Sequence, residues 1–185
     1  MRLPLIAALS LLATPVLAHT GTGFHLHGFE DGMMHPLTGA DHIAAMVAVG
    51  LWAAFLGGRA LWALPLAFLV AMGLGAALGH AGFVVPALET LIAASVIALG
   101  AVLAFGLSVP VTLGAALCGA FAVVHGMAHG VEMPANAAGL AYGLGFVIAT
   151  AALHATGLVA GRFGSILLRV AGAGVALAGL AFLAA

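Results

Sequence analysis

The sequence predicts an all-α polytopic membrane protein with six transmembrane helices after a cleavable signal peptide. Hydrophobic residues make up 65% of the 185 positions, and charged residues only 5%, against about 25% in soluble domains. Six apolar stretches of spanning length follow one another along the chain. This composition excludes a soluble domain. Because the chain has no Lys and few Arg, it also lacks the basic patch that a nucleic-acid-binding protein needs.

Residues 1–18 have the pattern of a secretory signal peptide. Arg2 supplies a positive charge, residues 3–12 form a short apolar stretch, and residues 16–18 (Val-Leu-Ala) fit a small-residue cleavage site. Cleavage would make His19 the first residue of the mature chain. The alternative is an uncleaved anchor helix, but the apolar stretch is shorter than the roughly 20 residues that a span requires.

Residues 19–34 form a polar segment rich in Gly and His, which includes His19, His25 and His27. The segment shows no apolar periodicity, so we expect an exposed, mobile arm on the periplasmic side. We hypothesise that its histidines gather metal ions, and that the N-terminal amine of a cleaved chain chelates together with His19.

The rest of the mature chain, 19–185, is expected to form a single six-helix transmembrane domain. Gly- and Pro-containing turn signals separate the apolar stretches, and each stretch has the length of a membrane-crossing helix. The predicted spans are 36–56, 61–79, 86–105, 110–129, 135–156 and 166–184.

The charges predict the orientation of these spans. A cleaved signal leaves the mature N-terminus in the periplasm, so that six spans place loops one, three and five in the cytoplasm. Those loops and their edges hold Arg59, Arg162 and Arg169, in agreement with the positive-inside rule. Trp52 and Trp62 flank loop one, where interfacial aromatic residues are expected. We therefore expect a multi-pass protein of the bacterial inner membrane.

Nearly all metal-ligand side chains fall toward the periplasmic side of this arrangement. They include every carboxylate and all His except His154. The carboxylates are Glu30, Asp31, Asp41, Glu89 and Glu132, and the histidines are His19, His25, His27, His35, His42, His80, His125 and His129.

The first group is His35, Asp41 and His42. Pro36 suits the first position of a helix, and if His35 begins the first span, His35 and His42 lie near one face. Asp41 and His42 would then lie about two turns inside the membrane, where an ionisable residue costs roughly 2.5–3.5 kcal/mol and needs a partner. The alternative is that the two residues only form hydrogen bonds between helices.

The second group is His125, His129 and Glu132. The two His are one helical turn apart, and Glu132 continues the same face if the helix continues. The alternative is a helix end whose His residues contact lipid headgroups or water. Glu89, in the first turn of the third span, is either a ligand or a carboxylate that stabilises the helix N-terminus. His80, at the end of the second span, is equally ambiguous.

The predicted ligands are imidazoles and carboxylates without thiolate, which suits Ni(II), Co(II) or Zn(II) better than Cu(I). We interpret Met46, Met127 and Met133 as packing residues, although they could be soft ligands. Cys118 is the single Cys, which excludes an intrachain disulfide, and we expect a small core residue.

The membrane potential contributes about 4.6 kcal/mol per 100 mV for a dication, or roughly three decades in concentration. Uptake then needs no ATP, and the chain has no P-loop lysine.

Four motifs resemble the HupE/UreJ family over essentially the whole mature chain. They are His35-Pro-x-x-Gly-x-Asp41-His42-x-x-Ala-Met-x-x-Val-Gly50, Pro86-x-x-Glu89-x-x-Ile-Ala-x-Ser95, His125-Gly-x-Ala-His129-Gly-x-Glu132 and Gly145-Phe-x-x-Ala-Thr-x-x-Leu-His154-x-x-Gly157.

The resemblance implies a six-helix inner-membrane protein that takes up nickel, or sometimes cobalt, for the maturation of NiFe hydrogenase or urease. Carried onto this sequence, the family's important positions are His35, Asp41, His42, Phe68, Glu89, His129 and Glu132.

We therefore predict a secondary permease, not an enzyme, that imports Ni(II) or Co(II) and holds no prosthetic group. His154 either serves the inner exit or is structural. One alternative is a non-transporting membrane metal receptor or assembly factor for a nickel enzyme; another is a haem or di-metal oxidoreductase with His42 and His125 as a ligand pair. The sequence leaves the oligomeric state open, including a homo-oligomer. The predicted metal ligands are His35, Asp41, His42, Glu89, His129 and Glu132, with His125 and His19 in support and His80 as a second choice.

Overall fold

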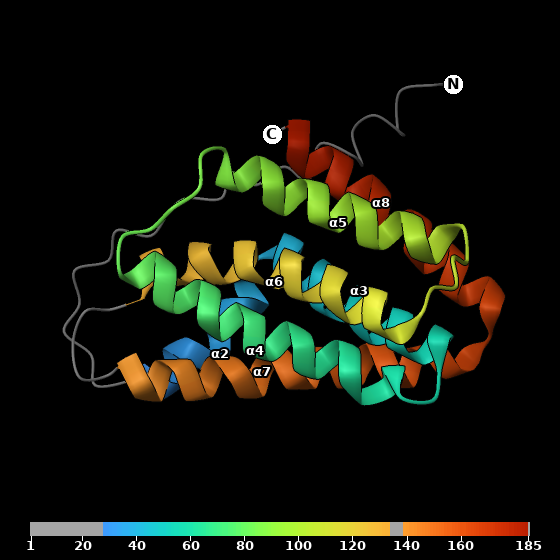
Figure 1. Cartoon of the computed structure of the whole chain (residues 1–185), viewed down its shortest axis with the longest axis horizontal. Helices are drawn as coiled ribbons and strands as arrows, with labels where there is room; N and C mark the ends of the chain where they lie inside the picture. The colour runs from blue at the N-terminus through green and yellow to red at the C-terminus, as the bar shows by residue number, and fades with distance from the viewer. Residues whose placement is uncertain (1–27, 134–138, 185) are drawn as a thin grey trace, which may run out of the picture.

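The computed structural model describes residues 28–133 and 139–184 (Figure 1). The predicted signal peptide and the first part of the arm, with His19, lie outside the described residues. All regular structure within the described ranges is helical, which confirms the predicted all-α class. The helices are α2 (Gly28–Thr38), α3 (Ala40–Leu56), α4 (Ala60–His80), α5 (Leu88–Ala104), α6 (Val111–Glu132), α7 (Gly139–Ala160) and α8 (Ser165–Ala184), with a short 3-10 helix, η2 (Gly161–Phe163), before α8.

The helices are apolar enough for a membrane. Four of them, α4, α6, α7 with η2, and α8, have the length and composition of membrane spans, and α2 with α3 passes the same test as one bent pair. Helix α5 is apolar but has 17 residues, or about 25 Å of rise. Large apolar side chains such as Leu74, Val70 and Ile166 are exposed on the outside of the bundle. The chain is thus a membrane protein of several apolar helices, while the count of six spans stays a prediction.

The prediction of one continuous helix over 36–56 is wrong. The chain makes two helices, α2 and α3, whose axes differ by 82°. Pro36 lies inside α2 rather than at a helix start, and it removes a backbone donor close to the helix end. Thr38 Oγ1 donates to the carbonyl of His35 at 2.7 Å, and Gly39 then takes an extended conformation. Asp41 and His42 therefore lie in the first turn of α3, not two turns inside a helix.

The end of the predicted arm also differs from expectation. Residues 28–34 form the first turns of α2, and Gly28 and Gly32 are buried. A Cβ on Gly32 would overlap the backbone of Tyr142, and a Cβ on Gly145 would overlap the carbonyl of Phe29. Helix α2 is thus fixed against α7 by two close backbone contacts that a polar, Gly-rich sequence makes possible.

Glycines determine which helices pair. A Cβ on Gly75 would overlap the carbonyl oxygen of Val123, and one on Gly79 the carbonyl oxygen of Met127. Four residues further along α4, the contact lies four residues further along α6, so the two helices run parallel. Helices α3 and α7 pair in the same way at Gly50 and Gly157, and α5 pairs with α8 at Gly100 and Gly172. Such close approach gives dispersion contacts between backbones, as is common between membrane helices.

Gly130 and Gly157, which follow the predicted spans 110–129 and 135–156 and are expected to begin turns, lie inside helices for the same reason. Helix α6 continues past Gly130 to Glu132, and α7 continues past Gly157 to Ala160. A Cβ on Gly130 would overlap the carbonyl of Ala76, so this glycine is needed for packing and not for a turn. The face that carries the histidines of α6 therefore extends to Glu132.

The charges separate to the two ends of the bundle. The turns after α3, α5 and α7 share one end, which carries Arg59 and Arg162, and the guanidinium of Arg169 lies close to Gly106. The opposite end carries His35, Asp41 and Glu132. Figure 1 shows the long helices lying side by side between these ends.

Only one of the two tryptophans fits the expected interfacial position. Trp62 is largely exposed. Trp52 is fully buried, and its Nε1 donates to the carbonyl of Leu107 at 3.4 Å. The prediction of an interfacial Trp52 is therefore wrong, because its position on the inner face of α3 decides its environment.

The glycine contacts can be tested with a matched pair on α4. Gly75→Ala should lower the stability of the protein by about 1–3 kcal/mol, because the new methyl group overpacks against α6. Gly73 has open space around its missing Cβ. Gly73→Ala should be neutral or stabilise by up to about 1 kcal/mol through helix propensity. Thermal unfolding in detergent measures both, and equal melting temperatures would contradict the packing assignment.

Candidate metal site

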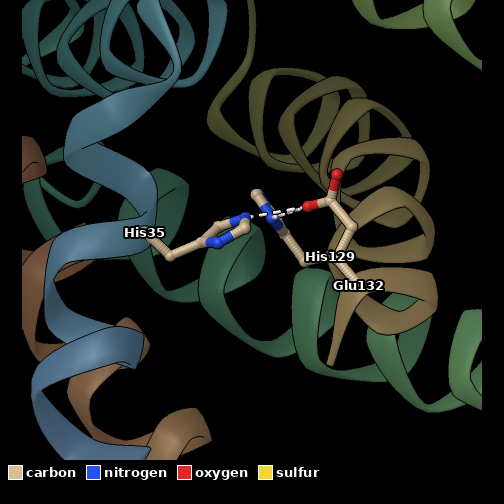
Figure 2. A group of neighbouring side chains, drawn as sticks. All are labelled: His35, His129 and Glu132. Carbon is tan, nitrogen blue, oxygen red and sulfur yellow. Dashed lines mark ion pairs between the residues drawn. The ribbon is translucent and has the colours of Figure 1, made fainter. Parts of the chain in front are cut away.

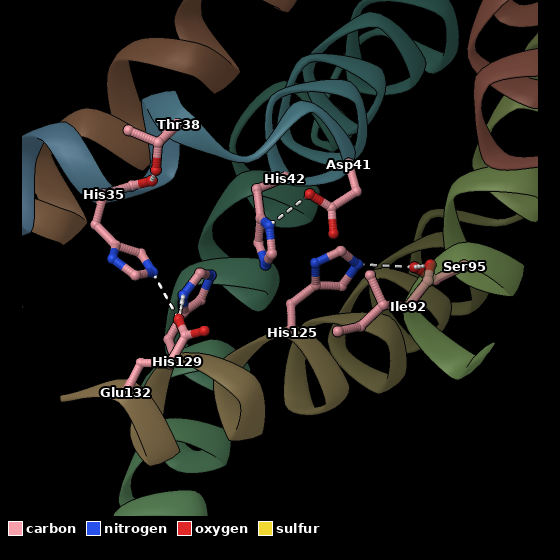
Figure 3. Close-up of polar contacts among 9 residues, drawn as sticks. All are labelled: His35, Thr38, Asp41, His42, Ile92, Ser95, His125, His129 and Glu132. Atoms are coloured by element: carbon pink, nitrogen blue, oxygen red, sulfur yellow. Dashed lines mark hydrogen bonds and ion pairs between the residues drawn. The ribbon is translucent and has the colours of Figure 1, made fainter. Parts of the chain in front are cut away.

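Four imidazole rings lie in a row where α2 and α3 meet α6 (Figure 3). The ring centroids of His35 and His129 are 4.9 Å apart, those of His129 and His42 are 4.2 Å apart, and those of His42 and His125 are 5.0 Å apart. Each ring thus contacts the next. Side chains from three helices, 94 positions apart in sequence between His35 and His129, form one continuous group.

The first part of the row is a surface cluster of His35, His129 and Glu132 (Figure 2). Glu132 Oε2 is 2.9 Å from His35 Nε2 and 3.9 Å from His129 Nδ1. One ligand atom from each residue lies within 4.8 Å of the others. Two ligands of one transition-metal ion, each at about 2.1 Å, lie up to ~4.2 Å apart. Small side-chain rotations therefore suffice for the three residues to bind one ion.

The second part consists of His42, which is partly buried, and His125, which is fully buried. His42 Nδ1 is 2.9 Å from Asp41 Oδ1, and because a carboxylate only accepts, Nδ1 is the donor. In the neutral ring Nε2 then carries a lone pair, and Nε2 has no hydrogen-bond partner among the described residues. A carboxylate that fixes the tautomer in this way is a common outer partner of metal-binding histidines. Asp41 therefore orients His42.

Gly39, at the bend between α2 and α3, leaves space for the pair formed by Asp41 and His42. A Cβ on Gly39 would lie 2.7 Å from His42 Nδ1 and 2.9 Å from Asp41 Oδ1. Such distances are too short for real Cβ contacts, so a larger residue would displace the pair. The extended conformation of Gly39 and its lack of a side chain thus serve the bend and the site together.

The tautomer of His125 follows from Ser95 on α5. The single hydroxyl proton of Ser95 goes to the carbonyl of Ile92 at 2.7 Å, because a carbonyl can only accept. Ser95 Oγ must then accept from His125 Nε2 at 2.8 Å. The neutral ring keeps its lone pair on Nδ1, which is buried and has no partner within the described part of the chain. A lone pair is therefore available for a metal on His125 as well as on His42.

His129 connects the two parts. Its ring contacts both His35 and His42, and neither of its nitrogens makes a hydrogen bond to a described residue. Exposure is highest at one end of the row and lowest at the other: 57% of the Glu132 side chain is accessible, 29% of His35, 4% of His129, 12% of His42, and His125 is fully buried. The row thus leads from the surface into the core.

Aromatic residues surround the imidazoles. The Phe146 ring on α7 lies 4.3 Å from that of His129, and the Tyr142 ring lies 5.7 Å from that of His35. Phe68 on α4 lies 6.1 Å from His125. These apolar side chains keep water from the inner rings, and their positions require the tertiary packing of α4 and α7 against α6.

The other predicted residues lie elsewhere. Glu89 is exposed in the first turn of α5 and makes no hydrogen bond or ion pair with another described residue, so its role as a ligand stays a prediction. The side chain of His80 is exposed at the end of α4. His154 is buried in α7, and Cys118 is fully buried in α6, as a small core residue would be. Met46 and Met127 are buried, and Met133 is partly buried.

The sequence interpretation did not assign a role to Ser95, Tyr142 or Phe146. Ser95 belongs to a quoted motif, but a serine on an apolar helix gives no sign of its partner before the helices are packed. Tyr142 and Phe146 are four residues apart on α7, and this spacing continues to Thr150 and His154. A search for a period of four on that helix would have found the whole face.

Known proteins resemble this chain over almost its whole length. The family model described as "HupE / UreJ protein" matches residues 7–182. The chain is 44% identical over 180 residues to "Protein HupE" of Rhizobium leguminosarum bv. viciae, with 95% of this chain and 94% of that protein covered. No solved structure is a significant match to the chain.

The surface cluster can be tested by metal binding. Glu132→Gln should weaken Ni(II) binding by the purified protein about 10–100-fold, because it removes the anionic member of the cluster. Asp31→Asn removes an exposed carboxylate of α2 that is no part of the cluster, and it should leave the affinity unchanged. Isothermal titration calorimetry in detergent measures both. An equal loss in the two variants would point to general charge and not to the cluster.

Proposed function

The chain belongs to the HupE/UreJ family, and we propose that it is a secondary permease that imports Ni(II), or Co(II), across the bacterial inner membrane. The metal serves the maturation of NiFe hydrogenase or urease, as the family implies. The chain acts as a carrier without a prosthetic group and not as an enzyme.

The observation that carries the proposal is the row of imidazoles. A receptor that only captures metal needs the surface cluster, whereas here ligand nitrogens continue into the core. The lone pairs of His42 and His125 are available there, and neither nitrogen of His129 makes a hydrogen bond to a described residue. A borderline dication can pass from one imidazole to the next by ligand exchange, since adjacent rings are in contact.

The charges support uptake of a cation. Glu132 and Asp41 supply negative charge to the row, and a dication in a low-dielectric region needs such partners. The potential adds about 4.6 kcal/mol per 100 mV for a dication that moves to the negative side. For His35 to bind a metal through Nε2, the ring must carry its proton on Nδ1, so that Nε2 presents its lone pair beside Glu132.

The orientation follows from the two ends of the bundle. We place the end with Arg59, Arg162 and Arg169 in the cytoplasm, as the positive-inside rule requires. The histidine row then opens to the periplasm, and the mature N-terminus follows a cleaved signal on the same side. The six spans are α2 with α3 as one broken span, α4, α5, α6, α7 and α8. The histidines of the arm, His19 among them, gather metal near this opening.

The two alternatives fit the geometry less well. A receptor or assembly factor for a nickel enzyme would need partner-binding loops, and the turn between α3 and α4 spans only residues 57–59. A haem would need to fit between two axial histidines, whereas the rings of His42 and His125 contact each other edge to face. The permease is therefore the function we propose.

Transport into proteoliposomes tests the proposal. Vesicles that contain only this protein should accumulate radioactive Ni(II) when an inside-negative potential is imposed, and Co(II) should compete. Asp41→Asn should slow uptake at least about tenfold, because His42 loses the carboxylate that orients it. Asp31→Asn is the matched control and should transport like the wild type. Tight Ni(II) binding without accumulation, in sealed and correctly oriented vesicles, would favour the receptor.

A further inference from the structure

One face of α7 carries a buried residue at every fourth position: Tyr142, Phe146, Thr150 and His154. Residues four apart on an α-helix lie above one another. The first two are the aromatic residues that contact the surface cluster, namely Tyr142 with His35 and Phe146 with His129. The same face then continues for about 12 Å of helix rise to His154. It runs from the cluster toward the arginine-bearing end of the bundle.

The two deeper residues of this face are polar, and they have no polar partner. His154 has 2% of its surface exposed and Thr150 none. Both nitrogens of His154 and the hydroxyl of Thr150 make no hydrogen bond to any residue that the structure describes. Polar groups this deep are almost always paired, so two unpaired ones on a single face need an explanation.

Phe68 connects this polar pair with the histidine row. Its ring centroid lies 6.1 Å from that of His125 and 5.2 Å from that of His154, the latter in an edge-on arrangement. Phe68 therefore contacts the last imidazole of the row on one side and His154 on another. The Phe68 ring is thus a neighbour of both the histidine row and His154.

We propose that His154 and Thr150 form a second, inner binding position for the transported dication, reached from His125 past the Phe68 side chain. This inference rests on the proposed permease function. An ion at this position takes an imidazole nitrogen of His154 and the hydroxyl oxygen of Thr150, and water completes its coordination. No carboxylate is present in this pair, so it binds more weakly than the surface cluster with Glu132. Weak binding suits a position that an ion must leave again.

A close contact between α3 and α7 fixes the position of His154. A Cβ on Gly50 would overlap the carbonyl oxygen of His154, so the backbones of α3 and α7 touch at this level. The side chain of His154 is thereby held on a rigid helix pair and not on a loop. A rigid support keeps ligand atoms in place, as an ion-binding position requires.

The test uses two changes on this face. Thr150→Val keeps the shape and removes only the hydroxyl, which makes no hydrogen bond to a described residue. The melting temperature should therefore stay the same or rise, while the initial rate of Ni(II) uptake into proteoliposomes falls about fivefold. His154→Gln should lower the rate about tenfold or more, as the loss of a metal ligand does. Both variants should bind Ni(II) at the surface cluster within about twofold of the wild-type affinity.

Thr156→Val is the matched control on the same helix. Thr156 is exposed on the outer side of α7, and its hydroxyl donates to the carbonyl of Ala152. The same chemical change there should leave uptake unchanged. If the buried pair had only a structural role, the variants would have a lower melting temperature. Thr150→Val is chosen because it should not lower the melting temperature.

The outcomes separate this inference from the proposed function. If the wild type accumulates Ni(II) and Thr150→Val and His154→Gln do so at the same rate, the inner position is overturned and the permease stands. If binding at the surface cluster falls in parallel with uptake, the residues act on that cluster and the inner position is also overturned. If the wild type accumulates no Ni(II), the permease fails, and the inner position fails with it.

Discussion

The 82° bend at Gly39 is the constraint on which the site depends. A continuous helix from His35 to His42 would point both side chains along one face, about 10 Å apart along the axis. The bend instead places His35 against Glu132 and His42 against His125, on either side of His129. One residue without a side chain therefore places two candidate ligands, neighbours in sequence, at two separate positions of a row that His129 joins.

The bend works only because the facing helix is held close. Helix α6 approaches α4 at Gly126 and Gly130, where any side chain would overlap the backbone of α4. These glycines alternate with the histidines, since Gly126 follows His125 and Gly130 follows His129. One face of α6 thus packs tightly while the adjacent face presents its imidazoles. The abundance of small residues in this chain therefore determines where its imidazoles lie, in addition to how its helices pair.

Much of this could be predicted from the sequence, and the errors have a common cause. The apolar stretches located α4 to α8 to within a few residues, and six of the predicted ligands, His125 included, lie in or beside the row. The predictions for Pro36, Gly130 and Trp52 were wrong because each rested on a local sequence signal, whereas the role of the residue depends on the helices that surround it. Gly130 is a turn signal in isolation and a packing residue against Ala76. Depth is likewise a tertiary property, so the sequence could not distinguish an exposed Glu89 from a buried His125.

The distribution of charge along the row gives it a direction. Glu132 contacts His35 and Asp41 contacts His42, while His125, the last imidazole of the row, depends on the neutral hydroxyl of Ser95. On the proposed path, an ion that moves from His42 to His125 exchanges anionic surroundings for neutral ones, so this last step binds it less tightly. A uniform row of carboxylates would hold a dication too strongly to release it, because conduction requires sites that ions can leave. The membrane potential acts on both charges of the ion over the same path and offsets the loss of anionic partners. For the proposed permease, selective capture at the surface and release toward the core are therefore compatible within one row of side chains.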